Sequence, residues 1–304
     1  MYDVIILGGG AAGLGAALYS ARYKLNTLLI AKEMGGTGLI AHKVDNWIGE
    51  PGIVGIPLMQ KFIDHVKSYK VPVVSEEVTD IKKNKDGTFI VKADKTYKSK
   101  SIIYTLGMKH RELGVPGEKE FSGKGVHYCY VCEGPLYQNK TVAVIGGSDS
   151  AGLGALFLAD YAKEVYVLYR KDKLRAEPIT AEQVYKHKKI KVIHNVNVKE
   201  FFGDKFLKGV KLDNGKETRL DGVFIEVGHV PLNELARTLR VEIDKNGFIK
   251  VDRAQKTNIK AFCAAGDVTN ANTLKQFITS AAEGSVAAES VYRYVSQGKW
   301  DKRG

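Results

Sequence analysis

The sequence predicts an α/β protein made of two domains, each with a sheet flanked by helices. Two observations lead to this prediction. The chain has 304 residues, which is more than one hydrophobic core usually organises. In addition, the pattern of a short apolar strand, a glycine-rich turn, a helix and a second strand occurs twice, once at the N-terminus and once after residue 140.

The first of these units opens the chain. A strand is expected over residues 2–7, a helix from the glycines to about Tyr23, and a second strand over residues 26–31. Gly8, Gly10 and Gly13 fall on the spacing G-x-G-x-x-G. In a Rossmann-like unit these glycines permit the tight turn, the approach of a pyrophosphate and close packing of the helix on the strand. The free N–H groups at the start of the helix then face the phosphates.

The second unit is the segment KTVAVIGGSDSAGLGALFLADYAKEVYVLYRKDKLRA, which begins at Lys140. It has the same order of strand, glycine turn, helix and strand. One glycine turn would be weak evidence, because such turns also serve ordinary packing. Two of them in full strand–helix–strand context predict two Rossmann-like dinucleotide-binding domains of the three-layer ββα type.

Short strands and breaks are expected between and after these units. Asp-Gly at 86–87 and Asn-Gly at 214–215 indicate two hairpins. Residues 114–125 are rich in glycine and contain a proline, which marks a linker, and a second boundary is expected near residues 228–235.

The C-terminal part is expected to contain a short apolar strand, a polar loop and a long amphipathic helix. Asp267 follows the strand directly. Its carboxylate is well placed to hold a ribose or ribityl hydroxyl, but this stretch taken alone favours an ordinary turn or helix-cap aspartate.

Composition narrows the class of protein. Hydrophobic residues make up 44% and charged residues 26% of the chain, and no apolar run reaches the length of a membrane span. The N-terminus lacks the basic start of a signal peptide, and three cysteines cannot form a secreted disulfide framework, so we expect a cytoplasmic protein. The net charge of +12 fits a lysine-rich solvated surface, or a field that attracts acidic proteins or phosphorylated cofactors. No nucleic-acid recognition module accompanies it.

Cys129 and Cys132 could bind a metal ion, form a structural disulfide or act as a redox-active pair. A structural zinc site needs about four ligands, and neither His127 nor Cys263, which lies in an apolar strand, completes one, so we expect no metal. A bridge across so short a loop restricts the unfolded chain little. A thiol pair that opens and closes reversibly is the interpretation that fits.

A series of segments resembles, in the same order, the motifs of the low-molecular-weight thioredoxin reductases. They are GGGAAG, GGTGLIAHKVDNWIGEPG, CYVCEG, VIGGSDSA, YRKDKLR, AFCAAGDV and KQFITSAAEG. The resemblance runs almost end to end. It implies an FAD-binding domain over residues 1–113 and 233–304, and an inserted NADPH-binding domain over residues 114–232 that carries the cysteines.

The resemblance also implies which residues contact the cofactors. For FAD these are Gly8, Gly10, Ala11, Ala12, Gly13, Glu33, Gly36, Thr37, Asn46, Gly107, Gly266, Asp267, Lys275, Gln276 and Phe277. For NADPH they are Gly146, Gly147, Ser148, Asp149, Ser150, Ala151, Arg170, Lys171 and Arg175.

The implied activity is the transfer of electrons from NADPH through FAD and the cysteine pair to thioredoxin, or to a thioredoxin-like or glutaredoxin-like protein. Cys132 is then the sulfur next to the flavin, and Cys129 attacks the substrate disulfide. Glu133 stands where the family has an aspartate and acts as the general acid–base. A homodimer is expected from the resemblance alone.

Several positions depart from the family pattern. Ser148 replaces a glycine of the second turn, Tyr169 a histidine and Lys171 an arginine of the basic cluster, and Thr37 a glutamine near the flavin. Three alternatives remain open beside the thioredoxin reductase. They are a relative that takes electrons from ferredoxin, the NAD(P)H-dependent reductase of a peroxiredoxin system, and a flavin-binding protein without catalysis.

Overall fold

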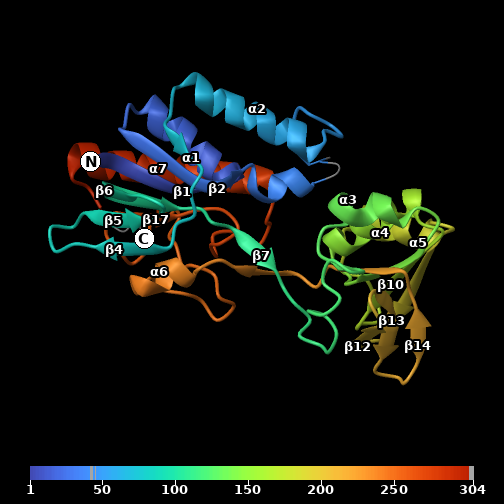
Figure 1. The fold of residues 1–304 in the computed structure, drawn as a ribbon. Coiled ribbons are helices and arrows are strands. Elements are labelled where there is room, and N and C mark those ends of the chain that lie inside the picture. Colours follow the sequence, from blue (N-terminus) through green and yellow to red (C-terminus); the bar gives the residue numbers. More distant parts are fainter. Residues whose placement is uncertain (42–43, 45, 301–304) are drawn as a thin grey trace. The chain divides into compact units, whose positions relative to one another are not determined.

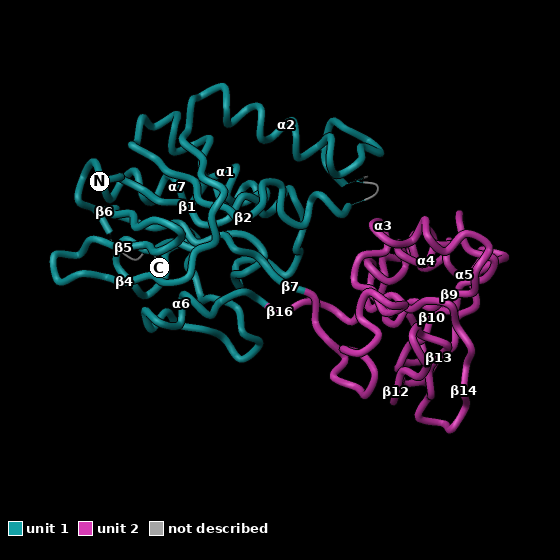
Figure 2. The backbone as a smooth tube through the Cα atoms, in the orientation of Figure 1, with its two compact units in different colours: residues 1–109, 231–304 teal, residues 110–230 magenta. Residues whose placement is uncertain are grey.

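The computed structural model describes residues 1–41, 44 and 46–300, and it divides into two compact units. Unit 1 consists of residues 1–109 and 231–304, and unit 2 of residues 110–230 (Figure 2). Strands β7 (Met108–His110) and β16 (His229–Pro231) pair with each other in a two-stranded sheet. Both passages of the chain from one unit to the other therefore lie in this short ribbon.

Unit 1 contains a seven-stranded sheet of order β3-β2-β1-β6-β5-β4, with β17 paired to β6 (Figure 1). Strands β3, β2, β1, β6 and β17 are parallel, whereas β4 and β5 form the predicted hairpin around residues 86–87. The strands are β1 (Tyr2–Gly9), β2 (Thr27–Met34), β3 (Val73–Val74), β4 (Asp80–Lys83), β5 (Phe89–Lys92), β6 (Thr96–Tyr104) and β17 (Phe262–Ala264). The helices are α1 (Ala11–Arg22), the 3-10 helix η1 (Gly36–Ile40), α2 (Gly55–Ser68), α6 (Glu234–Thr238) and α7 (Phe277–Gln297).

Strand β1 shows how the sequence builds three layers. Its apolar side chains alternate between the two faces of the sheet. Val4 and Ile6 pack with α1, α2 and α7, whereas Ile5 and Leu7 pack with β4, β5 and the chain around α6. All four are fully buried, so the continuous apolar run of β1 reflects a strand that is covered on both sides.

Unit 2 repeats this arrangement around a parallel sheet of order β11-β10-β9-β15-β8. Its strands are β8 (Val126–His127), β9 (Thr141–Ile145), β10 (Glu164–Tyr169), β11 (Ile190–His194) and β15 (Gly222–Ile225). A three-stranded antiparallel sheet contains β12 (Val198–Gly203), β13 (Leu207–Leu212) and β14 (Glu217–Arg219), and residues 214–215 form its second turn as predicted. The helices are α3 (Tyr130–Glu133), the 3-10 helix η2 (Gly134–Tyr137), α4 (Asp149–Tyr161) and α5 (Pro178–Lys186).

The core of unit 2 lies on both faces of β9. Val142 and Val144 pack with α4, while Ala143 and Ile145 pack with β12 and β13. The predicted class, α/β with two Rossmann-like units, is therefore confirmed. Among the described residues, no helix has the length and apolar character needed to span a membrane.

Candidate active site

Unit 1 holds a cavity of about 560 Å³ at the end of β1, where the glycine turn leads into α1. This volume is within the range of small-molecule sites. Most of the residues expected to contact FAD line the cavity. They are Gly8, Gly10, Ala11, Ala12, Glu33, Gly36, Thr37, Gly107, Gly266, Asp267, Lys275, Gln276 and Phe277.

Gly13 and Asn46 are not among the lining residues. Gly13 faces the turn itself, since a Cβ built on it would lie 1.8 Å from the carbonyl oxygen of Gly8. The amide of Asn46 donates a hydrogen bond to Gln276 Oε1 at 3.1 Å, so it supports a lining residue. Residues 42, 43 and 45 of the same segment lie outside the described residues.

The glycine turn is shaped for a phosphate group. Gly8 has a φ of +112°, which side chains rarely adopt, and makes the turn possible. A Cβ on Gly10 would meet no atom within 4 Å, so the space above this residue is open at the N-terminus of α1. Open space, backbone N–H groups and the helix dipole together suit a pyrophosphate such as that of FAD.

Asp267 lines this cavity as a turn residue after β17. It does not cap α7, because Gln276 is the N-cap of that helix and forms a capping box with Thr279. Ser280 Oγ donates to Asp267 Oδ1 at 3.0 Å, and burial raises the pKa of the carboxyl. Asp267 therefore combines a fixed orientation with access to the cavity, as binding of a sugar hydroxyl would require.

Sequence reasoning missed Ser280 and Glu283 in this region. Glu283 is buried and accepts hydrogen bonds from the N–H of Gly266 at 2.7 Å and from Asn272 Nδ2 at 2.7 Å, so it fixes the turn that carries Asp267. The one signal in the sequence was that both residues lie in the first two turns of the helix that begins beside Gln276.

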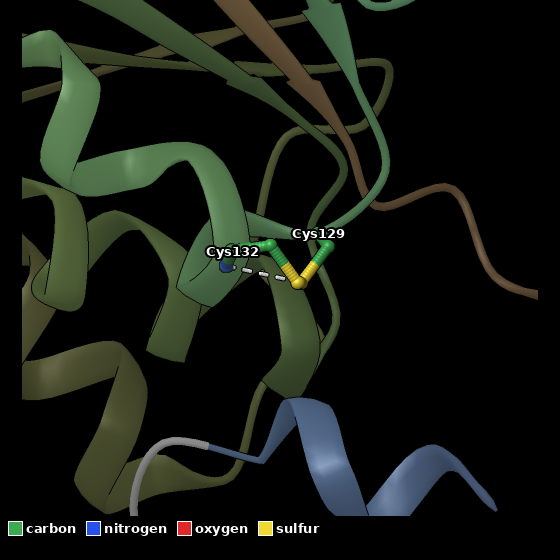
Figure 3. The surroundings of a disulfide bond; sticks show 2 residues. All are labelled: Cys129 and Cys132. Atoms are coloured by element: carbon green, nitrogen blue, oxygen red, sulfur yellow. Dashed lines mark hydrogen bonds between the residues drawn. A yellow bond between two sulfur atoms is a disulfide. The ribbon is translucent and has the colours of Figure 1, made fainter. Parts of the chain in front are cut away.

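In unit 2, Cys129 and Cys132 form a disulfide at the start of α3 (Figure 3). The backbone N–H of Cys132 donates to Cys129 Sγ at 3.1 Å. Cys132 is exposed and Cys129 is half-buried, so the bridge is accessible to other molecules. Cys263 is fully buried in β17, as the sequence predicted.

Glu133 lies next to this disulfide. Its carboxylate and the two sulfur atoms are all within 4.8 Å of one another. Glu133 Oε2 is buried and has no hydrogen-bond partner among the residues that the structure describes, and burial raises the pKa of the carboxyl. A carboxyl group beside two sulfurs, with its pKa raised by burial, is placed to give a proton to a leaving thiolate.

The glycine turn of unit 2 connects β9 to α4, and Ser148 is the N-cap of this helix. Gly146 has a φ of +149°, and a Cβ on Gly147 would lie 2.5 Å from the ring of Tyr169. Asp149 Oδ1 accepts a hydrogen bond from the N–H of Glu177 at 2.8 Å. Ser150 and Ala151 belong to the first turn of α4.

The basic cluster follows β10. Arg170, Lys171 and Arg175 are all exposed. The backbone N–H of Arg175 donates to the Gly147 carbonyl at 2.6 Å, which ties this residue to the turn. Arg175 Nε also donates to Tyr169 Oη at 3.2 Å. The tyrosine that replaces the family's histidine thus positions one of the expected phosphate ligands.

Glu226 is a third residue that sequence reasoning missed. It follows β15 beside the glycine turn, since a Cβ on Gly146 would lie 2.2 Å from its carbonyl oxygen. Only 4% of its surface is exposed, and burial raises the pKa of its carboxyl to about 8. The sequence could have indicated Glu226, because it is an acidic residue that directly follows the apolar strand β15.

Comparison with known proteins assigns this combination of features to a family. The profile of the family described as pyridine nucleotide-disulphide oxidoreductase matches residues 2–284. A thioredoxin reductase of Listeria innocua is 38% identical over 98% of this chain and 95% of its own length. The chain belongs to this family.

Solved structures agree with the assignment. A thioredoxin reductase of Lactococcus lactis superposes with a TM-score of 0.93 at 34% identity, over 97% of this chain and 99% of its own. One from T. acidophilum gives a TM-score of 0.90 at 37% identity, over 96% and 97%. The predicted class of enzyme and its cofactors are confirmed, because thioredoxin reductases of this family are oxidoreductases that use FAD and NADPH.

Proposed function

We propose that this chain reduces the disulfide of thioredoxin, or of a thioredoxin-like or glutaredoxin-like protein, through Cys129 and Cys132. The observation that carries the proposal is the accessible disulfide with Glu133 within 4.8 Å of both sulfurs. The relatives named thioredoxin reductase support the choice of substrate.

The domain assignment is part of the proposal. Unit 1 is the FAD-binding domain expected over residues 1–113 and 233–304, and unit 2 is the NADPH-binding domain expected over residues 114–232. FAD, when bound, supplies two-electron transfer from NADPH to the disulfide, with Cys132 on the flavin side. Asp267 holds a hydroxyl of the bound cofactor, and the open space at Gly10 admits its phosphates.

Arg170, Lys171 and Arg175 bind the extra phosphate of NADPH, and the turn from Gly146 to Ala151 binds its pyrophosphate. Arg175 is already held at the turn by its bonds to Gly147 and Tyr169. Ser148 offers a hydroxyl where the family has a glycine, and this hydroxyl makes no capping bond to α4.

The reduced pair acts by thiol–disulfide exchange. The Cys129 thiolate attacks one sulfur of the substrate disulfide, and a mixed disulfide forms while the other substrate sulfur leaves as a thiolate. Glu133 gives that thiolate a proton. Cys132 then attacks Cys129, which releases the second substrate thiol and restores the bridge between Cys129 and Cys132.

A homodimer and a cytoplasmic location complete the proposal, as the resemblance and the cysteine usage predict. Sedimentation of the purified protein tests the first. If NADPH leaves the flavin oxidised while reduced ferredoxin bleaches it, the electron donor is ferredoxin.

The test separates the two half-reactions. In Cys129→Ser, NADPH should still bleach the flavin, and reduction of thioredoxin should fall by at least about 10³-fold because the nucleophile is lost. Cys263→Ala is the matched control, since this cysteine is buried in unit 1 and should leave both reactions unchanged. Thioredoxin turnover that survives in Cys129→Ser would overturn the proposal.

A further inference from the structure

The loop over residues 170–175 follows β10 and carries Arg170, Lys171 and Arg175. These are the cations that the proposed function assigns to the extra phosphate of NADPH. The loop contains neither helix nor strand, so no repeating backbone pattern fixes its path. Bonds from neighbouring segments must therefore hold the three cations in one arrangement.

The start of the loop is held by the end of β11. His194 is the last residue of this strand and lies opposite Tyr169 in the parallel pair of β10 and β11. Its Nδ1 is 3.0 Å from the carbonyl oxygen of Lys171, and the N–H of Asn195 donates to the same oxygen at 3.4 Å. Two consecutive residues thus fix the backbone at Lys171.

Tyr185 on α5 connects His194 to a second point of the loop. Its Oη is 3.1 Å from His194 Nε2, and it accepts the backbone N–H of Leu174 at 3.5 Å. The rings of Tyr185 and His194 lie 6.0 Å apart. Together the two side chains contact the loop at Lys171 and at Leu174.

The Lys171 carbonyl fixes the direction of these bonds. A carbonyl oxygen only accepts, so Nδ1 of His194 carries the proton. In the neutral ring Nε2 is then an acceptor and takes the hydroxyl proton of Tyr185, whose oxygen remains free to accept from Leu174. Each donor meets an acceptor with a single tautomer of His194, and loss of either side chain removes a bond to the loop.

We propose that His194 and Tyr185 are positioning residues that hold the loop over residues 170–175 in the form that binds the extra phosphate of NADPH. The inference rests on the phosphate site of the proposed function and deepens it, because it names residues on which the preference for NADPH over NADH depends. A loop that is ordered beforehand loses little conformational entropy when the phosphate binds. Without these bonds, the ordering of the loop opposes binding of NADPH, whereas NADH has no phosphate for the loop to hold.

A purely structural role predicts a different result. If the bonds served only to pack α5 against β11, their loss would disturb unit 2 as a whole and would weaken both nucleotides alike. The ratio of the two affinities therefore distinguishes a positioning role from a structural one.

Calorimetric titration of the FAD-loaded protein with NADP⁺ and with NAD⁺ provides the test, because these probes differ only in the extra phosphate and leave the flavin oxidised. His194→Phe keeps a ring and removes both nitrogens. Its Kd for NADP⁺ should rise by about tenfold, and its Kd for NAD⁺ should change by less than about twofold. Tyr185→Phe removes only the hydroxyl and should raise the Kd for NADP⁺ by about threefold or more, again with little change for NAD⁺.

His187→Phe is the matched control. His187 is half-buried like His194 and follows α5 directly, but its Nδ1 accepts the backbone N–H of Lys189 at 3.3 Å, outside the loop. Both affinities should stay within about twofold of those of the parent. An unchanged Kd for NADP⁺ in either His194→Phe or Tyr185→Phe, or an equal loss for both nucleotides, overturns the proposal. Tyr185→Phe keeps its ring and provides the test even where His194→Phe does not fold.

A double-variant background shows whether the effect passes through the cations. When Arg170→Ala and Lys171→Ala are combined, the loop has less charge to present to the phosphate. Addition of His194→Phe to this background should raise the Kd for NADP⁺ by less than about threefold. A rise as large as in the parent background would overturn the proposal.

The same titrations keep this inference apart from the proposed function. A parent protein that binds NADP⁺ no more tightly than NAD⁺ would refute the phosphate site itself, and this inference with it. A parent that prefers NADP⁺, with the same preference retained in His194→Phe and Tyr185→Phe, would refute only the role of these two residues.

Discussion

Glu226 shows how a single buried carboxyl makes the stability of the fold depend on pH. Its pKa is raised to about 8 by burial, against about 4.3 in an unfolded chain. Between these values the folded protein holds a proton that the unfolded chain releases. The contribution of this carboxyl to the free energy of unfolding is therefore fully present below about pH 4 and is lost as the pH rises toward 8.

Glu226→Gln should therefore be more stable than the parent at pH 8, by on the order of 1 to 4 kcal/mol, and about equal to it at pH 4.5. Urea unfolding at several pH values measures the difference between the two proteins. Glu217→Gln on β14 is the control, since that side chain is exposed. Parallel curves for Glu226→Gln and the parent would show that the carboxyl is not buried as described.

Residues whose role depends on spacing could be predicted from the sequence, and residues whose role depends on burial could not. Gly8, Gly10 and Cys129 stand in short local motifs, and the structure places the two glycines in the cavity and Cys129 in a disulfide. Glu226 and Ser280 gain their properties from the folded structure, Glu226 through burial and Ser280 through its bond to Asp267 across the loop before α7, and no local pattern records either.

At the scale of elements, the turn between β1 and α1 gives two glycines different tasks. Gly10 has a φ of −78° and open space around it, so an added methyl group should fit. A methyl group on Gly13 would collide with the Gly8 carbonyl, which backbone atoms cannot easily avoid. A methyl group on Gly10 therefore changes the cavity, whereas one on Gly13 disturbs the packing of α1 on β1.

We therefore expect Gly10→Ala to leave the unfolding free energy of the apoprotein within about 0.5 kcal/mol of the parent and to weaken FAD binding by more than about tenfold. Gly13→Ala should destabilise the apoprotein by about 1 to 3 kcal/mol. Thermal unfolding and titration with FAD, followed by fluorescence, distinguish the two. Unchanged FAD affinity in Gly10→Ala would place the phosphates elsewhere.

Elements with strong periodicity were predictable. The strand–turn–helix units and the hairpins at residues 86–87 and 214–215 depend on local glycines and alternating apolar residues. Helix α3 was not predicted, because four residues are too few for a helical period and its start is fixed by the disulfide and the bond of the Cys132 N–H to Cys129.

At the scale of the whole molecule, the chain leaves unit 1 and returns to it through one ribbon. The divisions lie after Lys109 and Val230, whereas composition suggested a linker over residues 114–125 and a boundary near 228–235. The linker expected over residues 114–125 lies after the observed division, because glycine and proline mark turns and not domain boundaries as such. Glu118 holds this segment within unit 2. Its carboxylate accepts bonds from the N–H groups of Leu113 and Gly114 and from Tyr128 Oη.

The central claim for the whole molecule is that electrons from NADPH reach the sulfur pair of unit 2. An anaerobic titration of the purified protein with NADPH, followed by absorbance and by a count of thiols in denaturant, tests it most directly. We predict that the flavin band bleaches and that two thiols per chain appear, one each from Cys129 and Cys132. A flavin that bleaches while the cysteines stay oxidised, or a protein that takes up no FAD, would contradict the account.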